Sequence, residues 1–148
     1  MRKFDHTLVD LVRLMNRPQR DSLLLQEAGV SIDRSLFPLL IAIERKGPIG
    51  VVELSELVGR DYTTVSQQAG KLASLGLISR RPSKAHNRVR EAAITTKGRQ
   101  ITSALDAARE RIAALLFAKW SKRDFQDLAR LMRRFVDDLQ SPPVRGDS

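Results

Sequence analysis

The sequence predicts a mainly α-helical fold that carries one small β-hairpin. Apolar residues recur every three or four positions along most of the chain, which is the period of helices that bury one face. A single region contains two short extended runs joined by a polar turn, which is the pattern of a hairpin. The 148 residues, of which 42% are hydrophobic and 29% charged, suffice for one domain with a core of its own.

The first 30 residues are expected to hold one amphipathic helix, over residues 4–16, which Pro18 ends or kinks. A short apolar patch, Leu23 to Leu25, follows before Gly29. The apolar positions of the expected helix are Phe4, Leu8, Leu11, Val12 and Met15.

The next helix contains a proline, which affects where it can begin. Ser31 is its expected N-cap, its apolar stripe runs from Leu36 to Ile43, and Gly47 and Pro48 end it. A proline inside a helix removes a hydrogen bond and costs about 3 kcal/mol. Pro38 therefore predicts either a kink or a late start.

Two short helices joined by a glycine-containing turn are expected next. The first covers residues 52–58 and closes at Gly59. Asp61 can cap the second, which runs from Tyr62 to Leu75 and ends at Gly76. The inward face of this second helix is expected to consist of Val65, Ala69, Leu72 and Leu75.

A basic β-hairpin follows the short helices. Its strands are Leu77–Ile78 and Val89–Ile94, and the turn between them is polar and contains a proline. Thr95 or Thr96 can then cap a long helix that extends to about residue 116.

The chain is expected to close with one more helix. Ser121 and Asp124 have the spacing of a capping box that opens it. Trp120, just before it, is expected to pack between the last two helices. The tail over residues 141–148 is expected to be disordered. The apolar stripe of the last helix is Phe125, Leu128, Met132, Phe135 and Leu139.

The positive charge of the chain is concentrated around the hairpin. Lys and Arg number 26 against 17 Asp and Glu, which gives a net charge of +9. Residues 79–99 hold seven of the cations and one acid, Glu91, so this segment carries a net charge of +6. Such an excess favours polyanionic partners, either nucleic acid or an anionic membrane surface.

Several classes of function are disfavoured by what the sequence lacks. With no cysteine, disulfide scaffolds, thiolate zinc sites and thiol catalysis are excluded. The two histidines, His6 and His86, have no nearby ligands, so no metal and no cofactor are expected. The sequence has no glycine-rich phosphate loop and no Ser-His-Asp arrangement, so no enzyme is expected. The longest apolar run is too short to span a membrane and the first segment does not resemble a signal peptide, so we expect a cytoplasmic protein.

Two short helices followed by a basic hairpin form the layout of a winged helix-turn-helix. In that layout the N-terminal part of the second helix enters the major groove of double-stranded DNA, and an arginine at the hairpin tip can enter the minor groove. Arg88 is the expected tip residue, whereas charge on the other hairpin arginines could instead protect the sheet edge from strand pairing. The expected DNA-binding residues are Thr63, Thr64, Ser66, Gln67, Lys71, Arg80, Arg81, Arg88 and Arg90.

The stretch from Gly47 to Arg99 resembles the winged-helix core of the multiple antibiotic resistance regulator (MarR) family of bacterial transcription factors. The motifs that carry the resemblance are TTVS in the second short helix, LGLISRRP at its end and ITTKGR before the long helix. The resemblance implies a homodimer that binds a pseudo-palindromic operator as a regulator, most simply a repressor. It also implies modulation by a small amphipathic aromatic effector, but it identifies no effector-binding residue.

The resemblance also implies how the chain is divided. Residues 1–30 form an N-terminal dimerisation region, 31–96 the DNA-binding core, 97–140 the C-terminal dimerisation helices, and 141–148 the tail. The expected dimerisation residues are Phe4, Leu8, Leu11, Met15, Phe125, Leu128, Met132, Phe135 and Leu139.

The sequence departs from the family pattern at several positions. His86 stands where an acidic residue usually precedes the tip arginine, and Gln68 stands where an apolar residue is usual. Gly70 lies inside the second short helix, at a cost of about 1 kcal/mol. Gly50 and Val51 replace the usual hydroxyl cap of the first one. An alternative function is a winged-helix module that binds proteins and no longer reads DNA; retention of the basic hairpin and of Arg88 argues against it.

Overall fold

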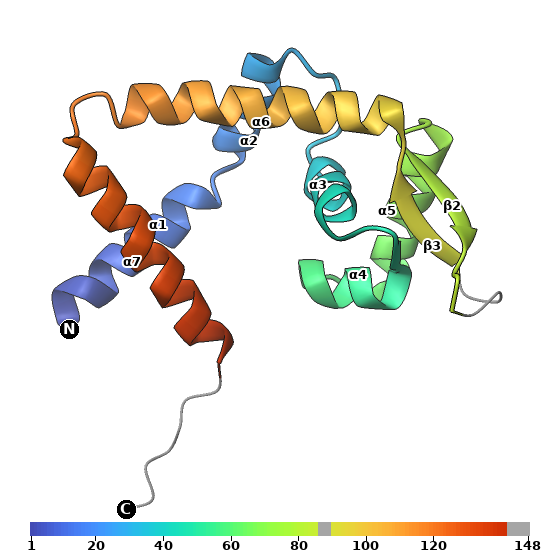
Figure 1. Cartoon of the computed structure of the whole chain (residues 1–148), viewed down its shortest axis with the longest axis horizontal. Coiled ribbons are helices and arrows are strands. Elements are labelled where there is room, and N and C mark those ends of the chain that lie inside the picture. The colour runs from blue at the N-terminus through green and yellow to red at the C-terminus, as the bar shows by residue number, and fades with distance from the viewer. Residues whose placement is uncertain (86–89, 142–148) are drawn as a thin grey trace, which may run out of the picture. The chain divides into compact units, whose positions relative to one another are not determined.

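The computed structural model describes residues 1–85 and 90–141. The chain divides into two compact units, Met1–Arg109 and Glu110–Ser148. The first unit contains most of the helices and the β-sheet, and Figure 1 shows the course of the chain. The fold is mainly α-helical with a small antiparallel sheet, as the sequence predicts.

Two helices open the first unit. α1 (Arg2–Met15) confirms the first expected helix, and α2 (Pro18–Ala28) was not predicted. Pro18 ends one helix and also begins the next, because a proline at the first helical position loses no hydrogen bond. Gly29 closes α2 with a left-handed backbone, at φ 66°.

The third helix starts late, as Pro38 predicted, but Ser31 does not cap it. α3 (Phe37–Lys46) has Pro38 in its first turn, where a missing N–H costs nothing. Before it, the Asp33 carboxylate accepts hydrogen bonds from the Ser35 backbone N–H at 2.8 Å and from the Ser35 hydroxyl at 2.6 Å. This turn is a local alternative to helix and keeps the segment after Ser31 non-helical.

The helix-turn-helix consists of α4 (Val51–Val58) and α5 (Tyr62–Ser74), as expected. Gly59 takes the left-handed conformation that the turn between them requires, at φ 69°. Leu75 was wrongly assigned to the inward face of α5, because the helix ends at Ser74 and the side chain of Leu75 remains 44% exposed.

Three antiparallel strands form a sheet with the order β1-β3-β2. β2 (Ile78–Pro82) and β3 (Arg90–Ile94) pair as the expected hairpin, with Arg80 opposite Ala92. The first strand was wrongly predicted to end at Ile78, because proline, which was assigned to the turn, is tolerated in an edge strand and Pro82 pairs with Arg90. β1 (Ile49–Gly50) was not predicted, because two residues show no alternation. Gly50 belongs to this strand and is also the N-cap of α4, which has no side-chain cap hydrogen bond.

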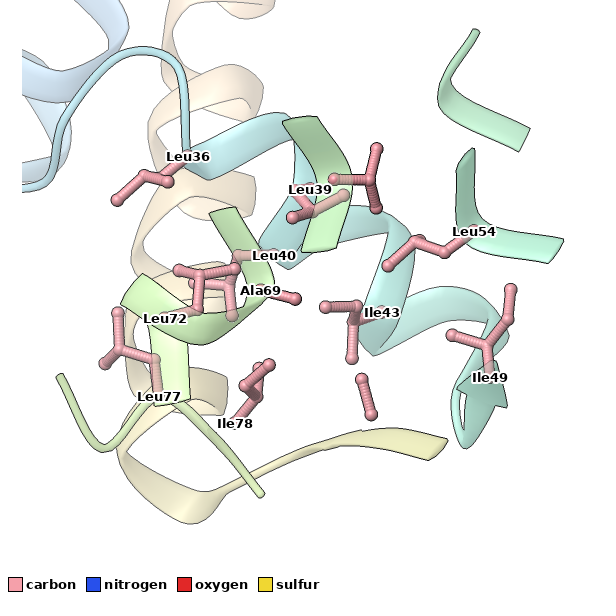
Figure 2. Packing of buried hydrophobic residues seen from close by; sticks show 12 residues of the cluster. Leu36, Leu39, Leu40, Ile43, Ile49, Leu54, Ala69, Leu72, Leu77 and Ile78 are labelled. Atoms are coloured by element: carbon pink, nitrogen blue, oxygen red, sulfur yellow. The ribbon is translucent and has the colours of Figure 1, made fainter. Parts of the chain in front are cut away.

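The core of the first unit holds α5 in place relative to the sheet. Buried side chains from α3, α4, α5 and all three strands form one apolar cluster, most of which is drawn in Figure 2. Val65, Ala69 and Leu72 are the residues that α5 contributes, and all three are fully buried. The opposite face of α5 is therefore turned away from the core.

The long helix α6 (Thr96–Leu116) is anchored to the end of α5 by its N-cap. The Thr95 hydroxyl accepts a hydrogen bond from the Gly98 N–H at 3.1 Å and donates one to the Gly76 carbonyl at 2.7 Å. Lys97 Nζ donates to the Leu75 carbonyl at 3.1 Å. These contacts give the ITTKGR motif a structural role and confirm Thr95 as the cap.

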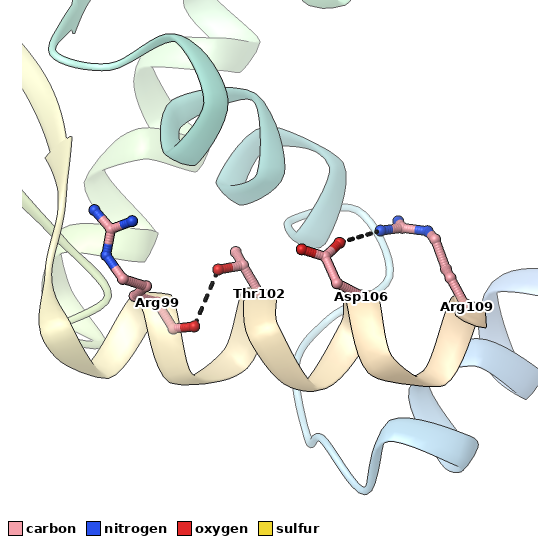
Figure 3. Close-up of polar contacts among 4 residues, drawn as sticks. All are labelled: Arg99, Thr102, Asp106 and Arg109. Atoms are coloured by element: carbon pink, nitrogen blue, oxygen red, sulfur yellow. Dashed lines mark hydrogen bonds and ion pairs between the residues drawn. The ribbon is translucent and has the colours of Figure 1, made fainter. Parts of the chain in front are cut away.

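Further along α6, two of its polar contacts lie within the helix itself. The Thr102 hydroxyl donates to the Arg99 carbonyl at 3.1 Å, and Arg109 pairs with Asp106 at 3.3 Å (Figure 3). The Arg109–Asp106 ion pair is exposed, and such pairs contribute little to stability.

The second unit ends in α7 (Lys122–Gln140), which Ser121 caps by accepting a hydrogen bond from the Asp124 N–H at 3.0 Å. Phe117 packs edge-on against Trp120 and Phe125, with ring centroids 5.0 and 4.9 Å away. Trp120 therefore contacts Phe117 but remains 47% exposed, and its packing between the last two helices stays a prediction. In the part of the chain described, no helix combines the length and the apolar character needed to cross a membrane.

Candidate nucleic-acid interface

The N-terminus of α5 is fixed by its cap. The Asp61 carboxylate accepts hydrogen bonds from the Thr64 N–H at 2.8 Å and from the Thr64 hydroxyl at 2.7 Å. These bonds stabilise the charged carboxylate and hold the pKa of Asp61 below its ordinary value of 3.8. The proton of the Thr64 hydroxyl is therefore engaged by the cap in the free protein.

The outer face of α5 presents polar side chains to solvent. Because each residue turns the helix by about 100°, Thr63 and Gln67 lie almost opposite the buried Val65 and Ala69. Thr63, Gln67 and Lys71 are exposed, whereas Thr64 and Ser66 are half-buried on the flanks. The structure thus brings all five expected residues of this helix to one side, with Thr63 and Gln67 at its centre.

A contact that the sequence did not predict ties the turn before α5 to its surroundings. Arg60 Nη1 donates to the Ser35 carbonyl at 2.9 Å and to Gln68 Oε1 at 2.8 Å. This contact explains why Gln68 replaces the usual apolar residue, since its amide oxygen binds a guanidinium. The polar residue at an otherwise apolar position was the signal that could have indicated a partner.

The hairpin brings further cations close to α5. α5 lies beside β2 (Figure 1), and the side chains of Arg80, Arg81 and Arg90 are exposed. Arg80 Nη2 donates to the Ser66 carbonyl at 3.1 Å, so its guanidinium lies on the helix and not over the free edge of β2. Arg80 is therefore poorly placed to protect the sheet edge from strand pairing, whereas Arg81 could still have that role.

Other expected features of the wing lie outside the described residues. Arg88, the expected minor-groove residue, and His86 before it fall between residues 85 and 90. Over residues 1–85 and 90–141, no three carboxylate or imidazole side chains gather closely enough to hold a metal ion. Within α5 no acidic residue follows the Asp61 cap, so no carboxylate of the helix opposes a phosphate.

Comparison with known proteins places this geometry in a family. A protein-family profile described as HVO_A0114 matches residues 35–91. The uncharacterized HTH-type transcriptional regulator YxaD of Bacillus subtilis (strain 168) is 30% identical over 111 residues, which cover 72% of this chain and 78% of YxaD.

Solved structures agree with the architecture over nearly the full length. A MarR family protein from Bacillus stearothermophilus is 21% identical with a TM-score of 0.81, and the match covers 95% of this chain and 99% of that one. A MarR transcriptional regulator from Methanosarcina mazei Go1 is 19% identical with a TM-score of 0.71, covering 93% and 98%. The chain therefore belongs to the helix-turn-helix transcriptional regulators, and its winged-helix fold is that of the MarR family.

Proposed function

We propose that this chain is a homodimeric repressor that binds a pseudo-palindromic operator and responds to a small molecule. The observation that carries the DNA-binding part is the outer face of α5, where Thr63, Gln67 and Lys71 are exposed opposite a fully buried face. Short polar side chains at that position can hydrogen-bond base edges, and the cation can contact phosphate.

The dimensions of α5 suit the major groove. Its 13 residues extend about 20 Å at 1.5 Å each, and its N-terminal turn is held rigidly by the Asp61 cap. When the second helix of a helix-turn-helix lies in the major groove, its N-terminal residues face the bases. The hairpin cations, with Arg88 at the expected tip, would then contact the DNA backbone and the minor groove. Thr64 and Ser66, on the flanks of the helix, remain expected contacts.

Homodimerisation is supported by the apolar faces of the terminal helices. Neither α1 nor α7 buries a single residue within the described chain, although both have strong apolar stripes. Met132 and Leu139 of α7 are 46% and 69% exposed. Exposed apolar stripes of this kind are typical of an interface, and a two-fold dimer would cover them. The boundaries proposed from the sequence, 1–30 and 97–140, remain those of the dimerisation segments.

Modulation by an amphipathic aromatic acid remains an expectation from the family resemblance. The described residues include an exposed hollow of about 210 Å³ in which two guanidinium groups lie among leucine side chains; it is lined by Leu14, Arg17, Gln19, Arg20 and Leu23. A panel of aromatic acids added to the DNA-binding assay tests this part separately from DNA binding.

A gel shift on the DNA that flanks the chain's own gene tests the proposal. The wild-type protein should shift this DNA in preference to unrelated DNA, and Gln67→Ala should weaken the preference. Gln100→Ala, which removes an exposed glutamine from α6, is the matched control and should behave as wild type. If the wild-type protein shifts no DNA at low salt, the protein-binding alternative replaces this proposal.

A further inference from the structure

One position on the outer face of α5 has no side chain. Thr63, Gln67, Gly70 and Ser74 follow one another at intervals of four, three and four, so they form a line along the face opposite the core. Gly70 interrupts this line in the middle of the helix, where glycine is unfavourable by about 1 kcal/mol relative to alanine. Its backbone is helical and not left-handed, so conformational need does not explain it.

The space above Gly70 is occupied by Arg80 of β2. A Cβ built on Gly70 would lie 3.7 Å from Arg80 Nη2, and no other heavy atom outside the helix backbone and neighbouring residues comes within 4 Å. The same nitrogen donates to the Ser66 carbonyl at 3.1 Å. The hydrogen bond thus places the guanidinium on the helix at this turn, beside the position that a side chain at residue 70 would enter.

The spacing of Ser66 and Gly70 explains why Arg80 can donate to the Ser66 carbonyl in addition to the backbone N–H that bonds this carbonyl within the helix. A helical side chain leans toward the N-terminus and covers the turn that precedes it. A side chain at residue 70 would thus cover the turn that contains Ser66, four residues earlier. Its absence leaves the Ser66 carbonyl open to Arg80.

We propose that the lack of a longer side chain at residue 70 leaves room for the Arg80 guanidinium on the outer face of α5, where it adds a cation to that of Lys71 and binds a DNA phosphate. This inference rests on the proposed DNA-binding function and deepens it. A guanidinium has five N–H donors, and the Ser66 carbonyl uses one of them. The bond to the helix orients the guanidinium before DNA arrives, so the phosphate contact costs less side-chain entropy.

The test measures how DNA affinity depends on salt for single and double variants. Each phosphate contact contributes about 1 to the slope of log affinity against log salt. Arg80→Ala should therefore lower the slope by about 2 per dimer. Gly70→Leu should cause the same loss, because its side chain fills the site of the guanidinium, and combining it with Arg80→Ala should cause no further loss. Gly70→Ala should keep the wild-type slope, since its Cβ only touches Arg80.

Two further variants keep the test specific. Arg81→Ala removes the neighbouring cation, which strand alternation directs to the other face of β2, so its effect should add to that of Gly70→Leu. Gly70→Lys in the Arg80→Ala background should restore the slope, because the helix then supplies the cation itself.

Additive effects of Gly70→Leu and Arg80→Ala, or an unchanged slope in Gly70→Leu, would overturn the inference. Urea unfolding should show Gly70→Leu to be at least as stable as wild type, since leucine is the better helix former. Failure of the wild-type protein to bind DNA would instead refute the proposed function.

Discussion

Substitution of Gly98 by alanine should destabilise the protein, although alanine is the better helix former. A Cβ at this position would overlap the carbonyl oxygen of Leu77 and lie 3.1 Å from both Cδ1 and Cγ1 of Ile94. The Leu77 carbonyl cannot move freely, because it accepts the Thr95 N–H at 3.1 Å and its residue is almost fully buried.

The magnitude follows from three contributions. Overpacking costs roughly 1–3 kcal/mol, and loss of the Thr95–Leu77 hydrogen bond costs about 1 kcal/mol more. Replacement of a helical glycine by alanine raises the free energy of unfolding by about 0.5–1 kcal/mol. We expect a net loss of about 2 kcal/mol in the free energy of unfolding.

Urea unfolding followed by far-UV circular dichroism, at one fixed protein concentration, measures this loss. Gly70→Ala is the matched control, because the same change in α5 meets only Arg80 Nη2 at 3.7 Å. It should raise the free energy of unfolding by up to about 1 kcal/mol. If Gly98→Ala is as stable as wild type, the close packing of α6 on the turn after α5 does not constrain residue 98 as argued.

Three other predictions address the core, the α5 cap and the dimer. Leu72→Ala should lower the free energy of unfolding by about 2–5 kcal/mol, because the side chain is fully buried, and a loss under 1 kcal/mol in urea unfolding would contradict the packing described. Because the folded-state pKa of Asp61 lies below its ordinary value of 3.8, its ionised form stabilises the fold above that pH, and this contribution disappears as the pH falls through the folded-state value. The urea-unfolding midpoints of wild type and Asp61→Asn should therefore converge as the pH is lowered. A difference that does not change with pH would show that the ionised Asp61 carboxylate does not stabilise the fold. Met132→Asp should convert a dimer into a monomer in sedimentation equilibrium, because it places a charge in the exposed apolar stripe of α7; an unchanged dimer would place the interface elsewhere.

Features governed by neighbouring residues were predictable from the sequence. Asp61, Thr95 and Ser121 cap their helices as expected, because a capping side chain reaches only two or three residues along the chain. Ser31 failed as a cap because a competing turn at Asp33 uses equally local chemistry.

Features that depend on distant residues were not predictable. β1 exists because it pairs with β3, which lies about 40 residues later, and its own two residues contain no strand signal. The candidate site shows the same division. Thr63 and Gln67 follow from helical spacing, whereas the contacts of Arg60 with Ser35 and of Arg80 with Ser66 join segments that only the tertiary fold brings together.

Base-by-base binding to the operator is the measurement that tests the central claim most directly. Fluorescence anisotropy would compare wild type and Gln67→Ala on the operator and on every single base-pair substitution of it. The exposed Gln67 side chain should be worth about 1–3 kcal/mol at the base pair it contacts, so the variant should lose discrimination there. The loss should occur at one position in each half-site, placed symmetrically about the operator centre, with half-sites about one helical turn apart. If Gln67→Ala keeps every base preference of the wild-type protein, the outer face of α5 does not read DNA.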